Sequence, residues 1–175
     1  MSLFALQPAP HPRWPIGLQA GLGIALPIAI MTLAGRPDLG FAAATGTFTI
    51  LYAGGRPTVE RARILPFVAA GLALCAALGV LAGAGGAWAV AAGTIVVAVI
   101  GAAAYAWSLG PPGPIFPVLV FGLSAYVTGS TPVEPLAFLV AAGAGCAFSF
   151  AIAMTPLALP RVRAVAAHPL RELLP

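Results

Sequence analysis

The sequence predicts an all-α integral membrane protein with six transmembrane helices. Hydrophobic residues make up 61% of its 175 residues and charged residues only 7%, and the mean hydropathy is +1.03. This composition leaves too little polar surface to cover a water-soluble globule. Long apolar runs alternate with short Gly, Pro and Arg clusters, and the length allows about six spans of roughly 20 residues each. We therefore expect a single transmembrane domain over residues 1–175.

The residue types exclude several classes of function. The eight basic residues are all arginine, so a GK[ST] phosphate loop and Schiff-base chemistry are excluded. So few basic residues, placed between apolar spans, do not favour a nucleic-acid partner. Cys75 and Cys146 lie in apolar runs without metal-ligand spacing, so we expect packed thiols and neither metal nor cofactor. No acid–base or nucleophilic constellation lies at membrane depth, and we do not expect an enzyme.

The first half of the chain predicts three spans. Ile16 to Ala34 is the first, kinked at Pro27. Leu39 to Ala53 is the second, which has only 15 residues and several threonines and barely crosses a hydrocarbon core of about 30 Å. An arginine-rich loop, Gly54 to Arg63, leads to the third span, Ile64 to Ala82.

The second half predicts three more spans. Ala87 to Leu109 is the fourth, and the following Gly110 to Pro114 cannot be helical because of its prolines. Ile115 to Val127 is the fifth and is again short. Leu136 to Pro156 is the sixth, and residues 157–175 form a tail.

The arginines predict the orientation of these spans. One set of loops and ends holds seven arginines, whereas the other set holds Arg36 alone. Because arginine is enriched on the cytoplasmic side of membrane proteins, both termini and the tail are expected in the cytoplasm. The N-terminal stretch lacks the compact apolar core and cleavage site of a signal peptide, so cleavage is not expected.

An internal repeat is indicated by an offset of 74 positions, which aligns YAGGRPTVE (52–60) with YVTGSTPVE (126–134). The same offset places the short second span on the short fifth span. The repeats then cover about 16–82 and about 87–156. Three spans in each repeat require opposite orientations in the membrane, and paired short spans in inverted repeats mark a binding region near the midplane.

The short spans supply the candidate residues for a substrate pathway. Hydroxyl groups would make its wall wettable, aromatic rings would stack on a solute, and an arginine at the mouth would concentrate anions. These residues are Thr45, Thr47, Phe48, Tyr52, Arg56, Phe116, Phe121, Ser124 and Tyr126. For each one a structural role is the alternative, since a helical threonine commonly bonds a preceding carbonyl.

The neighbouring charges have simpler interpretations. Arg61 and Arg63 are interpreted as anchors that set the topology, and Glu60 as the neutraliser of a neighbouring arginine.

Two motifs resemble those of a known family. GTFTILYAGGRPTVERAR (46–63) is similar to the "GAF…LYG…R.R" signature that closes the second span in the fusaric-acid-resistance (FUSC) and aromatic acid exporter superfamily. PPGPIF (111–116) resembles the PPGP-F motif at the start of that family's fifth span. The resemblance covers residues 16–156, and Thr47 stands where the family pattern usually has alanine.

The resemblance implies a function. It implies efflux of aromatic carboxylic acids or similar organic anions across a bacterial inner membrane. The span number is also similar to that of plant malate-channel proteins in the same superfamily, which implies a homodimer. However, no charged residue falls well inside a predicted span, whereas proton relays need such groups. A passive anion channel and a structural or accessory membrane subunit are therefore the alternatives.

Overall fold

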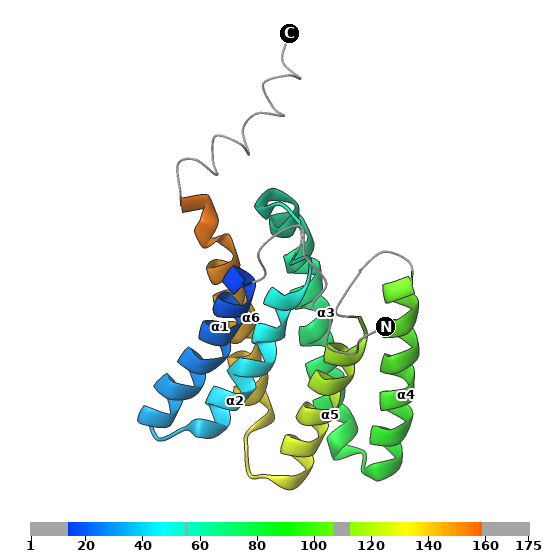
Figure 1. Cartoon of the computed structure of the whole chain (residues 1–175). Helices are drawn as coiled ribbons and strands as arrows, with labels where there is room; N and C mark the ends of the chain where they lie inside the picture. Colours follow the sequence, from blue (N-terminus) through cyan, green and yellow to red (C-terminus); the bar gives the residue numbers. More distant parts are fainter. Residues whose placement is uncertain (1–13, 55, 107–112, 159–175) are drawn as a thin grey trace, which may run out of the picture.

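The computed structural model describes residues 14–54, 56–106 and 113–158, and within them helices joined by turns are the only regular secondary structure (Figure 1). The elements are α1 (Trp14–Leu33), α2 (Pro37–Gly46), the 3-10 helix η1 (Thr47–Leu51), α3 (Thr58–Ala84), α4 (Ala87–Ala104), α5 (Ile115–Ser130), α6 (Pro135–Met154) and the 3-10 helix η3 (Thr155–Ala158). The expectations for residues 1–13, Gly55, residues 107–112 and the tail from 159 lie outside this described part.

Four of these helices, α1, α3, α4 and α6, are long and apolar enough to span a membrane. They indicate a membrane protein, in agreement with the composition. The other two are shorter: α2 has 10 residues and continues into the five residues of η1, and α5 has 16. Helices α2 and α5 are therefore the short ones, as the sequence predicts for the second and fifth spans.

The helices run alternately in opposite directions through the bundle (Figure 1). The turns after α1, α3 and α5 lie at one end, which we call the lower end, as it is drawn. The segment between η1 and α3 lies toward the opposite, upper end, together with the last turn of α6. Charged residues follow this division: Arg36 and Asp38 are at the lower end, and the Arg56 to Arg63 segment is at the upper end.

The packing of the helices has a regular pattern. Helix α2 packs against α1 and α6, and α5 packs against α4 and α3. Helices α1 and α6 touch, as do α4 and α3, and the two long helices α3 and α6 also touch each other. Exchanging the first three helices for the last three leaves these pairs unchanged, although a small α2–α3 contact has no comparable contact between α5 and α6.

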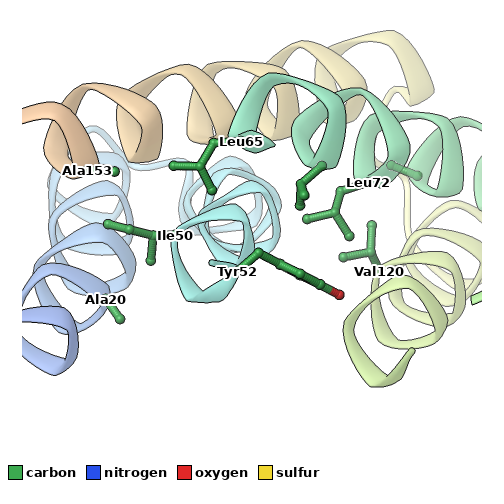
Figure 2. Close-up of a cluster of buried hydrophobic side chains, with 9 residues drawn as sticks. Ala20, Ile50, Tyr52, Leu65, Leu72, Val120 and Ala153 are labelled. Carbon is green, nitrogen blue, oxygen red and sulfur yellow. The ribbon is translucent and has the colours of Figure 1, made fainter. Parts of the chain in front are cut away.

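The main hydrophobic core surrounds η1 (Figure 2). Ile50 of η1 and Leu65 of α3 are fully buried and belong to one cluster with Ala20, Val120 and Ala153, which come from α1, α5 and α6. The short second segment is therefore enclosed by the longer helices. Enclosure is required because the change from α to 3-10 geometry weakens its own backbone hydrogen bonding, which lipid cannot replace.

Glycines set the closest helix crossings. A Cβ atom on Gly46 of α2 would collide with the backbone of α6 at Ala142, and one on Gly145 of α6 would collide with Ala43 of α2. On the other side of the bundle, a Cβ on Gly79 of α3 would collide with the backbone of α5. Small residues allow such close backbone approach in membrane helices.

The boundaries of the third span were predicted wrongly. The sequence places Gly54 to Arg63 in a loop, but α3 already begins at Thr58, six residues before the expected start. Pro57 occupies the N-cap position with φ −55° and ψ 148°, and the following Glu, Arg and Ala residues have good helix propensity. The charges of this segment therefore lie on the first turns of a helix.

Candidate functional site

A cavity of about 880 Å³ lies between the second segment, which is α2 with η1, and the fifth segment, which is α5. Its walls come from α1, α2, η1, α5 and the start of α6. Three of the predicted pathway residues line it, Thr45, Phe48 and Tyr126. The remaining walls are mainly apolar and include the aromatic rings of Phe41 and Phe138. The two short segments thus share a cavity, but it is apolar rather than the wettable passage that the sequence suggests.

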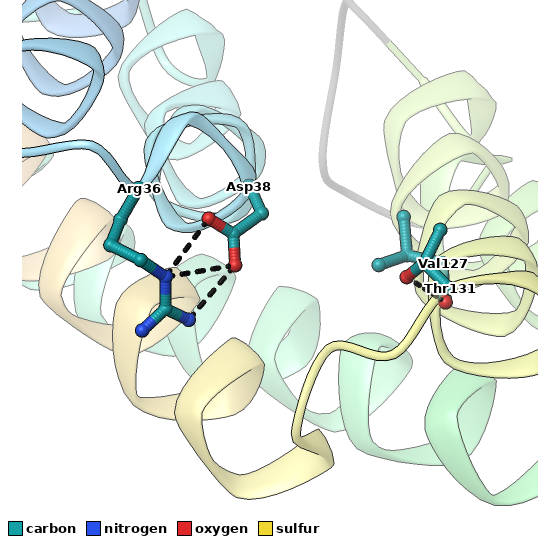
Figure 3. A network of polar contacts seen from close by, with 4 residues as sticks. All are labelled: Arg36, Asp38, Val127 and Thr131. Atoms are coloured by element: carbon teal, nitrogen blue, oxygen red, sulfur yellow. Dashed lines mark hydrogen bonds and ion pairs between the residues drawn. The ribbon is translucent and has the colours of Figure 1, made fainter.

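An ion pair lies at the lower end of this cavity (Figure 3). Arg36 donates from Nε to both carboxylate oxygens of Asp38, at 3.2 and 3.3 Å, and from Nη2 to Oδ2 at 2.9 Å. These hydrogen bonds lower the pKa of Asp38 from its usual value and raise that of Arg36. Both groups are therefore charged at neutral pH, and the pair as a whole is neutral.

The opposite rim of the same end is formed by α5. Thr131 donates from Oγ1 to the Val127 carbonyl at 2.6 Å, and both residues line the cavity (Figure 3). Polar groups thus gather at the lower end, and the interior between them and Phe48 is apolar.

Three aromatic rings join the second and fifth segments. The rings of Phe48 and Phe116 have centroids 4.7 Å apart, and Tyr52 meets Phe116 edge to face at 6.3 Å. Both separations fall in the favourable range for aromatic pairs. Phe48 belongs both to this cluster and to the cavity wall, so the cluster adjoins the cavity.

The buried hydroxyl groups mostly bond to their own helix. Thr45 donates to the Ala42 carbonyl at 2.7 Å, Thr49 donates to Gly46 at 2.8 Å, and Ser124 donates to Val120 at 2.7 Å. These are the structural roles that the sequence left open as the alternative. Their protons are engaged and are not free for a solute.

Thr47 has a different partner, in the first helix. Proline has no N–H, so the carbonyl four residues before it in a helix lacks its donor. Pro27 leaves the Gly23 carbonyl in this state, and Thr47 Oγ1 donates to that oxygen at 3.0 Å. Thr47 therefore faces α1 and does not line the cavity.

Tyr52 bonds to the turn before the fifth segment. Gly113 precedes α5, whose N-cap is Pro114, and the buried Tyr52 hydroxyl donates to the Gly113 carbonyl at 2.9 Å. The second segment thus supplies one side-chain donor to the carbonyl that Pro27 leaves free in α1 and another to the turn that leads into α5. In a membrane such partners are required, because lipid offers no hydrogen bond.

Phe121 and Ser124 turn toward α3 and α4. Phe121 is 1% exposed, and its ring lies where a Cβ on Gly93 of α4 would be. Ser124 lies against Gly79 of α3, whose added Cβ would come within 2.8 Å of the serine Cβ. The structure therefore separates these two from Thr45, Phe48 and Tyr126.

The arginines near the start of α3 differ in their surroundings. Arg56 is exposed and pairs with Glu60, with Nη1 and Oε2 separated by 3.5 Å, so the interpretation of Glu60 as a neutraliser is confirmed. Arg61 is only 5% exposed, and its Nη2 donates to the Ile50 carbonyl at 3.0 Å. Arg61 therefore caps the end of η1 from inside the protein.

The sequence analysis missed this role of Arg61. Buried residues of α3 continue from Arg61 at helical spacing through Leu65, Val68, Leu72 and Ala76. Exposed positions of the same helix, such as Phe67 and Leu74, are equally apolar, so no amphipathic pattern in the sequence marks the buried face.

Comparison of the chain with protein-family models, with curated proteins and with solved structures gives no match. Among the described residues, no three His, Cys, Asp or Glu side chains gather in a way that could hold a metal ion. The site is thus a mainly apolar cavity, partly walled by aromatic rings, with a neutral ion pair at one end. Such a site suits an amphipathic solute with a flat apolar body.

Proposed function

We propose that the protein is a membrane transporter that exports aromatic carboxylic acids or similar organic anions. The observation that carries the proposal is the cavity that α2 and α5 line together, with Phe41, Phe48, Tyr126 and Phe138 in its wall. Aromatic walls favour an aromatic body by stacking and by burial of apolar area.

The charge distribution supports an anionic solute. Arg56, Arg61 and Arg63 gather at the start of α3, where Glu60 is the carboxylate nearest in sequence. A net positive end raises the local concentration of anions. By the arginine bias we propose that this end faces the cytoplasm, as in a bacterial inner-membrane exporter of the FUSC type.

The proposed architecture is six spans in two inverted repeats, assembled as a homodimer. The alternation of helix directions and the main helix contacts, which are unchanged by exchange of the two halves, support the two repeats. The homodimer rests on the resemblance in span number to the plant malate-channel proteins. In such proteins the solute binds between the repeats, and the cavity between α2 and α5 has that position.

A passive anion channel is the second candidate, and one observation favours it. Within the described residues, every carboxylate lies at or before the first turn of a helix, at Asp38, Glu60 and Glu134. Proton coupling normally uses carboxylates or histidines inside the membrane. Transport of an anion down its gradient needs no such group.

The test is flux of a labelled aromatic carboxylate, such as benzoate, into proteoliposomes that contain the purified protein. Leu123→Trp fills the cavity and should lower the rate by about tenfold, equivalent to about 1.4 kcal/mol. Leu119→Trp is the matched control, because both leucines lie on α5 and are 42% exposed, but only Leu123 lines the cavity.

The outcomes separate the candidates. Flux that follows an imposed pH gradient supports the exporter, whereas flux that follows voltage and ignores the pH gradient supports the channel. Equal rates for the two tryptophan variants would overturn the assignment of the cavity. Absence of flux with the native protein would leave the accessory subunit as the remaining function.

A further inference from the structure

A second cavity, of about 550 Å³, runs along α3 and α4. On α3 it is lined by residues spaced about one turn apart, beginning at Arg63 and passing Phe67, Gly71, Leu74 and Leu78. This spacing places them on one face of the helix. From Arg63 to Leu78 the helix rises about 22 Å, which exceeds half of a hydrocarbon core of about 30 Å.

Helix α4 forms the other wall. Val97, Ile100, Gly101 and Ala104 line it at helical spacing, and Tyr105 lies at the same end as Arg63. The two walls therefore form a groove that is apolar along its length and has its arginine at the upper end.

The groove is accessible to lipid. Phe67 is 81% exposed, Leu74 60% and Ile100 63%, and α3 and α4 are two of the helices long and apolar enough to span a membrane. At Gly71 an added Cβ would meet no atom within 4 Å. The middle of the groove is thus open space at membrane depth.

The arginine at the end of the groove has no polar partner among the described residues. Arg36 and Arg56 pair with carboxylates, and Arg61 donates to a backbone carbonyl. Arg63 is exposed and, in the part of the chain that the structure describes, makes neither an ion pair nor a side-chain hydrogen bond. Its five N–H donors are available to a ligand.

From these observations we infer that the groove between α3 and α4 binds one anionic phospholipid. An acyl chain lies along Phe67, Gly71 and Leu74, and the phosphate accepts hydrogen bonds from the Arg63 guanidinium. A guanidinium binds phosphate through two parallel hydrogen bonds, and basic pockets between membrane helices bind anionic headgroups. The site is separate from the cavity between α2 and α5 and does not depend on the transported solute.

Native mass spectrometry of the purified full chain tests this inference. The protein is mixed with equal amounts of phosphatidylglycerol and phosphatidylcholine that carry identical acyl chains. One basic residue near an anionic surface contributes enough for about a fivefold preference. We expect the native protein to retain phosphatidylglycerol with that preference and Arg63→Gln to retain both lipids equally.

Three further variants make the test specific. Arg56 is another exposed arginine from the same region of the chain, but it does not line the groove. Arg56→Gln should therefore keep the preference for phosphatidylglycerol. Arg63→Lys, which keeps the positive charge, should show most of the native preference for phosphatidylglycerol. At Gly71 an added Cβ meets no atom within 4 Å, so Gly71→Leu places a side chain in the groove and should lower retention of both lipids. Folding is checked by gel filtration.

Three results would overturn the inference. They are an unchanged preference in Arg63→Gln, an equal loss in Arg56→Gln, and unchanged lipid retention in Gly71→Leu. The second would show that general surface charge attracts the lipid, and the third that no acyl chain occupies the groove.

Discussion

The hydroxyl of Thr47 donates to a carbonyl of α1 that Pro27 leaves without its helical donor. From the sequence, Thr47 was a candidate for the pathway and Pro27 a kink in the first span. Their pairing shows that a polar residue in the second segment is needed for the backbone of the first. Tyr52 also donates outside its own segment, to the Gly113 carbonyl in the turn before α5.

Thr47→Val removes the donor and keeps the shape of the side chain. We expect a loss of about 1 kcal/mol in the free energy of unfolding, in line with hydrogen bonds between membrane helices. In a Pro27→Ala background the new N–H can bond Gly23, so the same change should cost less. Unfolding in mixed micelles measures both values.

The control for the comparison of Thr47→Val in these two backgrounds is Thr94→Val in α4. Thr94 donates to Val90 of its own helix at 2.7 Å, so its removal leaves no other helix without a partner. An equal cost for Thr47→Val in both backgrounds would contradict the proposed relation to Pro27.

Arg61 is the second residue whose role depends on its surroundings. Arg61→Ala removes a charged donor from the Ile50 carbonyl and leaves that buried oxygen unpaired, which costs about 1.5–3 kcal/mol. Arg56→Ala removes an exposed pair and should change the unfolding free energy by at most about 1 kcal/mol. Comparable losses for the two variants in the same unfolding assay would show that Arg61 acts only as a surface charge.

At the scale of the elements, helix crossings with close backbone contact organise the bundle. Helices α2 and α6 meet at Gly46 and Gly145, and α3 and α5 meet at Gly79. These crossings hold the two short segments against the two long helices α3 and α6. The cavity remains between the short segments because each is fixed to a different long helix.

Gly145→Ala tests the closeness of the first crossing. Its methyl group would meet the backbone of Ala43, so the helices must separate, at a cost of about 3 kcal/mol. Gly143→Ala on the same helix meets nothing within 4 Å and should be neutral or slightly stabilising. Thermal unfolding of the two variants gives the comparison, and similar midpoints would contradict the crossing.

At the scale of the whole molecule, the alternating helix directions place successive turns at opposite ends (Figure 1). Arg56 lies at the upper end, just before α3. Ser130 is the last residue of α5, which ends at the lower end. From the arginine bias we predict that the upper end faces the cytoplasm.

Single-cysteine labelling tests this topology. In a background without Cys75 and Cys146, Ser130→Cys should react with an impermeant maleimide added to intact cells. Arg56→Cys should react only after the membrane is opened. The reverse labelling would invert the orientation, and labelling of both from outside would contradict an odd number of crossings between them.

The sequence by itself determined the class of protein, because composition and apolar run length are sufficient to specify helices that bury their backbone polar groups in lipid. It also determined that the second and fifth elements are short, since prolines, glycines and charges bound them locally. The Arg56–Glu60 pair could be predicted for the same reason, as its partners are four residues apart.

Only the tertiary structure decided which side chains meet. Thr47, Phe121 and Ser124 share the short segments with Thr45, Phe48 and Tyr126, yet they face other helices. The direction of a side chain depends on which neighbour a helix packs against, and in a uniformly apolar sequence the amphipathic pattern that would reveal it is weak. The burial of Arg61 and the groove that ends at Arg63 follow from the same packing.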